Sequence, residues 1–400
     1  MGAVEEFEGV SQGRSRRALG LIAIGLALAL VAGIIYLRPF ARPASPAPAA
    51  TPAGHFNLPS SMEWVSAGEG WLVFNDGNNH ATLFHTRDAG RHWQANLLVS
   101  GRAGRLTFFD AGRGVVTIRG DAAAVSVLQT TDGGRSWQLL HLPELTGRYL
   151  LDVPFSDPRH AWLAAPATQP YLAGATTFDL YRTDNGGEAW QRFPGGALKG
   201  LPAPPQGAPL FATSRDGWVL IDRQLYSSHD GGDSWQPETL DLSAATPDSA
   251  VSLVQASLSP GGRVALTLEG FPPSGQVPRG VDIWVAASSD GGHTWQPPVH
   301  IPETQSPSGN PSQQPPEFTD AWNGWLAVGP AMYTTADSGR SWNRKAMPSG
   351  APCVDVTPVS AGTAWCAGQS AAAQYPKGFQ VRLFRTVDGG RHWSGVDPPV

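Results

Sequence analysis

The chain has 400 residues, which include 47 glycines, 36 prolines and 15 tryptophans, and only 15% of the residues are charged. The formal net charge of −5 argues against a nucleic-acid-binding protein, because such proteins present a basic surface. Many glycines and prolines together with many tryptophans are typical of short strands joined by frequent turns. The composition therefore favours an all-β fold.

The N-terminal region predicts a membrane anchor. Residues 18–37 form an uncharged, apolar run of 20 residues, which as a helix spans a bilayer core of ~30 Å. Three arginines closely precede this run and two closely follow it, so the positive-inside rule favours a cytoplasmic N-terminus. The alternative is a cleaved signal peptide that ends near Ala47-Pro48-Ala49. That site lies well beyond the apolar run, so we favour an uncleaved anchor.

A proline- and alanine-rich segment follows, and residues 38–54 read RPFARPASPAPAATPAG. Proline lacks a backbone donor and fixes φ, so we expect an extended stalk here. The chain is thus predicted to comprise a short cytoplasmic tail (1–17), a transmembrane helix (18–37), this stalk (38–54) and a globular domain (55–400). We expect a single-pass protein of the cell membrane whose domain lies outside the cytoplasm.

An eight-residue pattern, which we call the turn motif, recurs seven times in the domain. Each copy fits [S/T]-x-[D/N]-x-G-x-x-W, as in TTDGGRSW at residues 130–137. Successive copies are 44 to 60 residues apart, a spacing typical of the blades of a β-propeller. The third position of the seven copies is occupied by Asp88, Asp132, Asn185, Asp230, Asp290, Asp337 and Asp388.

Apolar runs around each turn motif predict four short strands per repeat, A to D. The run ATLFHT leads into the first motif, and WQANLL starts at its tryptophan, so the motif is the C–D turn of an antiparallel hairpin. Further upstream, SAGEGW is typical of an A–B turn followed by strand B. Because the strands are antiparallel, A–B and C–D turns share one end of the sheet. The B–C and D–A connections lie at the other end.

The residue types of the turn motif have a structural explanation. Glycine at the fifth position permits a positive φ, which a tight turn requires. Hydroxyl and carboxylate side chains bond backbone N–H groups of turns, and the tryptophan packs its large face beneath the turn. Asn185 supports this interpretation, because an amide accepts hydrogen bonds but cannot serve as a general base or nucleophile. We therefore expect the acids of the motif to be structural rather than catalytic.

The turn motif resembles the Asp-box, the repeat of bacterial neuraminidases (BNR repeat), over residues 58–400. This sialidase-like superfamily includes sialidases, sortilin-type receptors, some endoglucanases and photosystem II assembly-factor-like propellers. The resemblance implies an all-β, seven-bladed β-propeller of four-stranded antiparallel blades. It also implies that the motifs lie at the periphery of the blades, away from any active site.

Five long connections are predicted at the end opposite the turn motifs, at residues 166–177, 193–209, 269–281, 296–317 and 368–380. Long loops raised on one side of a rigid scaffold usually carry binding sites. The arginines near them suit an acidic partner or a lipid headgroup, although solvated surface arginines are the simpler interpretation of each. The candidate binding face comprises Arg102, Arg105, Arg148, Tyr171, Phe271, Arg279, Tyr375 and Lys377.

The chain has two cysteines, Cys353 and Cys366, which fall in predicted strands A and B of the last repeat. They flank the intervening turn at similar distances, so adjacent antiparallel strands bring them within range of a disulfide bond. Oxidation is permitted outside the cytoplasm. The alternative is a pair of buried thiols.

We predict no catalytic residue, no metal site and no cofactor. The sequence lacks HExxH, CxxC, GxGxxG, P-loop and GxSxG patterns. Sialidases require an arginine triad and a tyrosine–glutamate pair, and no tyrosine here has that context. A glycoside hydrolase with two carboxylates is harder to recognise, and acids at the open end include Glu269, Asp282, Glu303 and Glu317.

These observations favour a non-catalytic, membrane-anchored propeller. We expect it to act in protein–protein recognition, assembly or scaffolding through the end that carries the long connections. The alternative is a carbohydrate-binding protein or a glycoside hydrolase similar to sialidases, with a glycan rather than a protein at the same end.

Overall fold

The computed structural model describes residues 59–76, 78–120, 125–140, 142, 153–166, 178–193, 209–221, 224–240, 250–259, 263–271, 282–301, 315–328, 331–348, 353–370 and 380–399. The predicted tail, transmembrane helix and stalk lie outside these residues. Within them, no helix has the length and apolar character that a membrane crossing requires.

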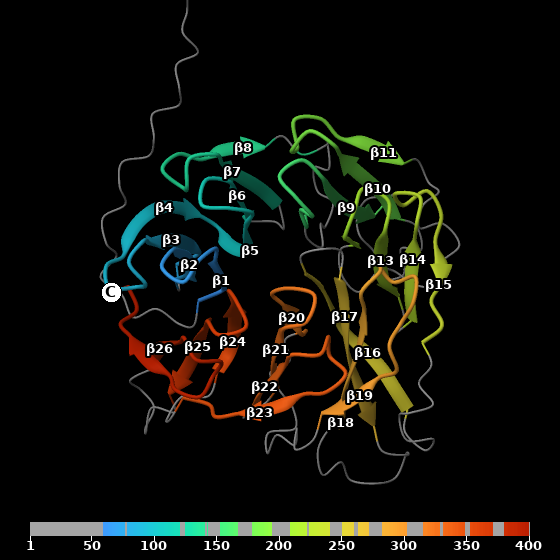
Figure 1. The fold of residues 1–400 in the computed structure, drawn as a ribbon. Helices are drawn as coiled ribbons and strands as arrows, with labels where there is room; N and C mark the ends of the chain where they lie inside the picture. The colour runs from blue at the N-terminus through green and yellow to red at the C-terminus, as the bar shows by residue number, and fades with distance from the viewer. Residues whose placement is uncertain are drawn as a thin grey trace, which may run out of the picture. The chain divides into compact units, whose positions relative to one another are not determined.

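The described residues form seven antiparallel sheets, which we number as blades 1 to 7 in chain order (Figure 1). Blade 1 contains β1 (Ser61–Trp64), β2 (Gly70–Asn75), β3 (His80–Thr86) and β4 (Gln94–Ser100). Blade 2 contains β5 (Arg102–Phe108), β6 (Gly114–Arg119), β7 (Val125–Thr130) and β8 (Gln138–Leu140). Blade 3 contains β9 (Ala161–Pro166), β10 (Phe178–Thr183) and β11 (Gln191–Phe193).

Blades 4 to 7 follow the same plan. Blade 4 contains β12 (Leu210–Phe211), β13 (Gly217–Ile221), β14 (Gln224–Ser228) and β15 (Gln236–Pro237). Blade 5 contains β16 (Ala250–Ser259), β17 (Arg263–Phe271), β18 (Asp282–Ser288) and β19 (Val299–Ile301). Blade 6 contains β20 (Glu317–Phe318), β21 (Gly324–Val328), β22 (Ala331–Thr335) and β23 (Asn343–Lys345). Blade 7 contains β24 (Cys353–Pro358), β25 (Ala364–Ser370), β26 (Gln380–Thr386) and β27 (Ser394–Val396).

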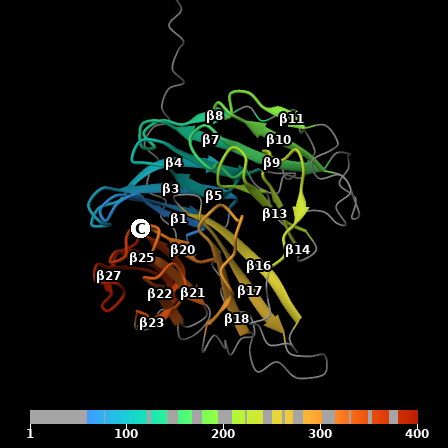
Figure 2. The ribbon, with the colours of Figure 1, turned by 45° about the vertical axis from the view of Figure 1, so that its right-hand side comes forward.

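The predicted seven-bladed propeller of four-stranded antiparallel blades is confirmed. Six sheets have four strands paired in chain order, as predicted. In blade 3 a single bridge between Phe155 and Ala161 stands where strand A pairs in the other blades. The strands vary in length, and β16 and β17 of blade 5, seen from the side in Figure 2, have 10 and 9 residues.

The core lies in the seams between neighbouring blades, where aromatic rings stack. Trp71 of blade 1 stacks on Phe108 of blade 2, with ring centroids 3.6 Å apart. Trp162 of blade 3 stacks on Phe211 of blade 4 at 4.0 Å. In these pairs the tryptophan is the second residue of strand B, and the partner ends strand A of the next blade. Each of these stacked pairs removes two large apolar faces from water, and such burial is the main stabilising contribution in a fold of this kind.

Blades 1 and 7 pack against each other and close the ring. Trp365 of β25 stacks on Trp64 of β1, with ring centroids 3.5 Å apart. The Thr357 hydroxyl of β24 donates a hydrogen bond to the Met62 carbonyl of β1 at 3.3 Å. Both sheets contain only strands from their own repeat. Within the described residues, closure therefore rests on side-chain packing between the first and last blades and not on an exchanged strand.

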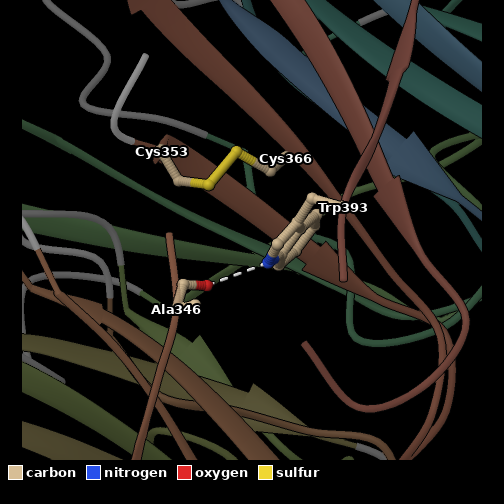
Figure 3. Close-up of a disulfide and its surroundings, with 4 residues drawn as sticks. All are labelled: Ala346, Cys353, Cys366 and Trp393. Carbon is tan, nitrogen blue, oxygen red and sulfur yellow. Dashed lines mark hydrogen bonds between the residues drawn. A yellow bond between two sulfur atoms is a disulfide. The ribbon is translucent and has the colours of Figure 1, made fainter. Parts of the chain in front are cut away.

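Cys353 and Cys366 form a disulfide bond between β24 and β25, with Cα atoms 5.6 Å apart (Figure 3). The two residues are not direct partners, because Val356 pairs with Cys366 and a β-bulge lies between Cys353 and Asp355. Both cysteines are buried in the seam between blades 6 and 7. The bond therefore fixes the innermost strand of the last blade to its neighbour.

Candidate functional site

The turn motif of blade 2 shows how the side chains hold the turn. The Thr130 hydroxyl accepts a hydrogen bond from the Gly134 N–H at 2.8 Å and donates one to Asp132 Oδ1 at 2.9 Å. The same Oδ1 accepts the Ser136 N–H at 2.9 Å, and Oδ2 accepts the Ser136 hydroxyl at 2.6 Å. Both carboxylate oxygens are thus occupied by the turn itself.

The other six copies repeat these contacts, with one informative exception. In six of the seven copies, blade 2 included, the side chain of the seventh motif residue donates a hydrogen bond to the second carboxylate oxygen. In blade 3 that residue is Ala189, and the acid is replaced by Asn185, whose Oδ1 accepts the Ala189 N–H at 3.0 Å. The amide appears where the second oxygen has no side-chain donor. The side-chain donors are His92, Ser136, Ser234, Thr294, Ser341 and His392.

The pKa values of the motif acids agree with this structural role. Hydrogen bonds from the His92 side chain and backbone lower the pKa of Asp88 to about 2. Partial burial raises the pKa of Asp290, but hydrogen bonds from Thr294 outweigh it and lower the value to about 2. Carboxylates with such low pKa values are poor proton acceptors near neutral pH. The motif therefore does not supply a general base.

Glycine at the fifth position of the motif lies against the preceding blade. Gly292 of blade 5 has a φ of +80°, and a Cβ there would lie 2.6 Å from Trp218 Nε1 of blade 4. Gly90 of blade 1 has a φ of +78°, and a Cβ there would lie 2.5 Å from Val396 Cγ1 of blade 7. The predicted positive φ is therefore accompanied by a close approach to the preceding sheet. The motif joins blades as well as strands.

Two tryptophans of the motif extend this link. The Trp93 indole N–H of blade 1 donates to the Asp397 carbonyl in blade 7 at 3.0 Å. The Trp393 indole N–H of blade 7 donates to the Ala346 carbonyl after β23 of blade 6 at 3.0 Å (Figure 3). In both cases the acceptor belongs to the preceding repeat. The tryptophan thus lies in the seam between two blades.

The backbone N–H of the fourth motif residue bonds the C–D turn to the A–B turn of the same blade. The Gly133 N–H donates to the Gly112 carbonyl of the A–B turn at 2.8 Å, and the Gly389 N–H donates to the Gly362 carbonyl at 2.9 Å. Equivalent bonds occur in blades 1, 3, 4 and 6. The A–B and C–D turns therefore share one end, as predicted from the antiparallel order. The B–C and D–A connections lie at the opposite end, which we call the open end.

The innermost strands carry a cluster of charged residues, which we call the central cluster. It comprises Glu63 of β1, Glu317 of β20, Asp355 of β24 and Arg105 of β5, from blades 1, 6, 7 and 2. Glu63 pairs with Trp71 and Glu317 with Trp325, so the two glutamates occupy equivalent positions in their blades. Arg105 and Asp355 lie at β-bulges, which often redirect side chains at functional sites.

Burial and neighbouring acids raise the pKa values of the two glutamates of the central cluster. Burial, followed by the charge of Asp355, raises the pKa of Glu317 to about 8, although Arg105 opposes the shift. Burial also raises the pKa of Glu63 well above its usual range, followed by the charges of Glu317 and Asp355. At neutral pH Glu317 is therefore mostly protonated, and the cluster offers both hydrogen-bond donors and acceptors.

The central cluster includes two of the residues that the sequence singled out, Arg105 and Glu317. Arg102 and Arg105 both lie within β5, the innermost strand of blade 2. Phe271 ends β17, Glu269 lies in that strand, and Asp282 starts β18. Arg148, Tyr171, Arg279, Glu303, Tyr375 and Lys377 lie outside the described residues.

Glu63 and Asp355 were not identified from the sequence. Glu63 precedes Trp64, and Glu317 precedes Phe318, each aromatic residue ending strand A six positions before the glycine of strand B. This acid–aromatic pair at a fixed distance from the glycine was a usable signal for Glu63. Asp355 has no such signal, because its placement depends on the bulge in β24.

No family model and no curated protein sequence matches the chain. Solved structures do match. YCF48 bound to D1 peptide is 18% identical, with 84% of this chain and 94% of that chain covered and a TM-score of 0.52. YCF48 from Cyanidioschyzon merolae is 17% identical over 84% of this chain and 97% of that chain, with a TM-score of 0.49. An ancestral GH74 enzyme is 14% identical over 86% of this chain and 55% of that chain, with a TM-score of 0.48. The likeness to YCF48 bound to D1 peptide supports the propeller fold.

Proposed function

We propose that the chain is a membrane-anchored, extracytoplasmic propeller of the Asp-box type that binds a protein partner and acts in assembly or scaffolding. The observation that carries this proposal is the contrast between the charged groups of the turn motifs and those of the innermost strands. At the turn end, the carboxylate oxygens of the motif acids accept hydrogen bonds from residues of their own turns. The central cluster places polar groups on the innermost strands, where a ligand would meet four blades at once.

The charges of the central cluster suit a peptide segment. Three carboxyl groups and one guanidinium, from Glu63, Glu317, Asp355 and Arg105, provide donors and acceptors for backbone and side-chain groups of an extended chain. YCF48, the structural neighbour, has been captured with a D1 peptide. A segment of a membrane protein, such as an extracytoplasmic loop, is therefore the class of partner that we propose, and we expect the long connections predicted at the open end to contribute to its binding.

The proposed location rests on two features. Residues 18–37 have the length and apolar character of a single membrane span. The disulfide bond between Cys353 and Cys366 suits an oxidising compartment outside the cytoplasm. A protease-protection experiment on intact cells tests this placement, since an extracytoplasmic domain is cleaved without permeabilising the membrane.

The partner face is tested by site-specific photo-crosslinking in native membranes. A photoreactive residue is introduced at Arg102, at the start of β5 near the open end, or at Val387 in the turn motif of blade 7, and both positions are exposed. We expect a discrete protein adduct from position 102 and none from position 387. Adducts from position 387 alone, or from neither position, would contradict the proposed face.

Glycoside hydrolysis is the second candidate function, and Glu317 is the observation that favours it. A carboxyl group with a pKa of about 8 that lies near other carboxylates has the properties of a general acid. If this candidate is right, the chain releases reducing sugar from polysaccharides, and Glu317→Gln abolishes the release. The motif variant Asp132→Asn is the control and would retain activity. A protein without hydrolytic activity that still forms the partner adduct supports the first proposal.

A further inference from the structure

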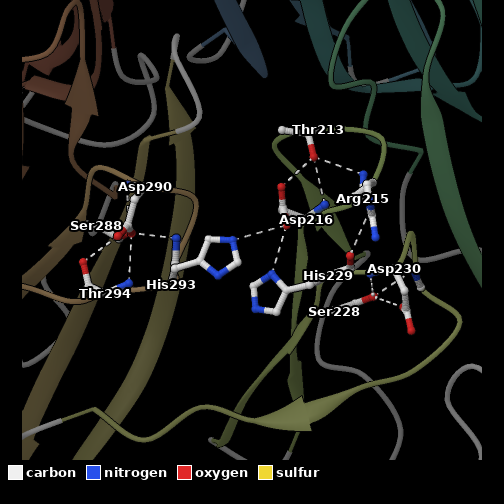
Figure 4. Close-up of polar contacts among 12 residues, drawn as sticks. Thr213, Arg215, Asp216, Ser228, His229, Asp230, Ser288, Asp290, His293 and Thr294 are labelled. Atoms are coloured by element: carbon white, nitrogen blue, oxygen red, sulfur yellow. Dashed lines mark hydrogen bonds and ion pairs between the residues drawn. The ribbon is translucent and has the colours of Figure 1, made fainter.

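Three potential metal ligands from two blades meet at the turn end. Asp216 lies in the A–B turn of blade 4, and His229 is the second residue of that blade's turn motif. His293 is the sixth residue of the turn motif of blade 5. One ligand atom from each residue lies within 4.8 Å of the other two. Figure 4 shows both imidazole rings beside the Asp216 carboxylate.

The distances between the ligand atoms are close to those of a zinc site. His229 Nδ1 lies 2.9 Å from Asp216 Oδ1, and His293 Nε2 lies 3.8 Å from the same oxygen. Ligands held about 2.0–2.1 Å from a tetrahedral zinc ion are about 3.3 Å from one another. Each observed distance differs from that value by about 0.5 Å or less. Small side-chain movements therefore suffice to enclose an ion.

The Asp216 carboxylate is held in place by its own turn. The Thr213 hydroxyl donates to Asp216 Oδ2 at 2.8 Å and accepts the Asp216 N–H at 2.9 Å (Figure 4). These bonds leave Oδ1 directed at the two imidazoles. Outer hydrogen bonds of this kind orient metal-binding carboxylates and reduce the cost of ordering them.

The imidazole rings of His229 and His293 are exposed enough to rotate. Their rings stack with centroids 4.2 Å apart and planes 18° apart. Nitrogen lone pairs lie in the ring planes, so one ring must rotate before both point at one ion. The exposed fractions are 39% for His229 and 55% for His293, and rotation therefore disturbs no core packing. Arg215, whose Nε donates to the His229 carbonyl at 3.3 Å, contributes a nearby positive charge that opposes cation binding.

We propose that Asp216, His229 and His293 form a binding site for a divalent transition-metal ion such as Zn²⁺. Two imidazoles and one carboxylate form a ligand set that suits zinc and leaves a position for water. Because the ligands come from blades 4 and 5, the ion joins two sheets and stabilises the folded chain. The sequence did not reveal the site, since its ligands lie in separate turns and match no local motif.

The test uses the full-length chain, without a histidine tag and in detergent, titrated with ZnCl₂ by isothermal titration calorimetry. We expect one ion per chain in the wild type and a rise in its melting temperature on zinc addition. The variant His293→Ala should bind at least tenfold more weakly, which corresponds to about 1.4 kcal/mol. It removes an exposed side chain, and circular dichroism should show an unchanged fold.

A matched control separates this site from other histidine–aspartate pairs. His392 is exposed, and its Nδ1 lies 2.6 Å from Asp388 Oδ2 in the turn motif of blade 7. Among the residues that the structure describes, no third potential ligand joins this pair. The variant His392→Ala should bind zinc as the wild type does. The proposal is overturned if the wild type shows no saturable binding below about 1 mM. It is also overturned if His293→Ala retains the affinity, or if His392→Ala loses as much.

Discussion

Glycine at the fifth position of the turn motif meets two separate requirements. A positive φ disfavours any residue with a Cβ, and at Gly292 the ring of Trp218 from the preceding blade occupies the space that a Cβ needs. The neighbouring Gly291 has a similar φ of +71°, but the nearest atom to a Cβ there is 3.9 Å away. A substitution at position 291 therefore tests backbone strain alone, whereas one at position 292 tests strain together with the contact between blades.

We predict that Gly292→Ala lowers the free energy of unfolding more than Gly291→Ala. Strain alone costs about 1–2 kcal/mol, and the steric conflict at position 292 adds about 1–3 kcal/mol. Urea denaturation of both variants measures the difference. Equal losses would mean that the turn tolerates a methyl group against blade 4, and that the contact between blades contributes little.

Asn185 in blade 3 allows a second test at the level of single residues. We predict that Asn185→Ala lowers the free energy of unfolding by about 1–2 kcal/mol, because it leaves the Ala189 N–H without its acceptor. Partner binding by the folded variant should persist. Loss of binding without loss of folding would contradict a structural role for this position.

The double variant Asn185→Asp, Ala189→Ser recreates the pairing found in blade 2. The new hydroxyl would donate to the second carboxylate oxygen, as Ser136 does to Asp132. We expect the two substitutions to be more stabilising together than the sum of the single variants, by about 0.5–1 kcal/mol. Strict additivity in chemical denaturation would count against this account of why the third motif carries asparagine.

At the scale of strands, the central cluster makes stability depend on pH. Glu317 in β20 has a folded-state pKa of about 8 against a usual value of 4.5. The folded chain therefore holds this proton more tightly than the unfolded chain, and stability falls as the pH rises through that interval. The slope from one such group is at most about 1.4 kcal/mol per pH unit.

We predict that Glu317→Gln stabilises the protein at pH 8 and has little effect at pH 4, because glutamine resembles the protonated acid. Thermal unfolding at the two pH values measures this. Glu188→Gln, at an exposed turn position, is the control and should shift neither value. Equal destabilisation of the Glu317→Gln variant at both pH values would show that folding does not raise the pKa of Glu317.

The disulfide bond of blade 7 gives a further prediction at this scale. It closes a short loop with a sequence separation of 13 between β24 and β25, so its loss should cost about 2–3 kcal/mol. Replacing both cysteines with alanine and measuring denaturation without reductant tests this. Unchanged stability would mean that the buried seam around β25 holds blade 7 without the bond.

At the scale of the whole molecule, periodicity explains why the fold could be predicted. Each of the seven motifs, from Asp88 to Asp388, forms a local hairpin turn. Its side chains make hydrogen bonds within the eight residues of the motif, so the turn can be recognised from the local sequence. The spacing of the motifs indicated a propeller, and the number of copies predicted the number of blades. An aromatic residue at the end of strand A, such as Trp64 or Phe108, is a further signal of the repeat in the sequence.

The functional groups were less predictable because they are brought together across repeats. Glu63 and Asp355 come from opposite ends of the domain sequence and meet only because blades 1 and 7 are neighbours. Asp216 and His293 likewise lie in different blades. Such contacts depend on ring closure and on β-bulges, and neither leaves a local pattern in the sequence.

Each turn motif joins its own blade to the preceding one through its fifth residue. Hydrogen exchange of the Gly292→Ala variant tests this most directly, with Gly291→Ala as the control. We predict faster exchange in β18 of blade 5 and also in β13 (Gly217–Ile221) of blade 4, whose Trp218 meets residue 292. Exchange that increases only within blade 5, with β13 as protected as in the control, would contradict the account.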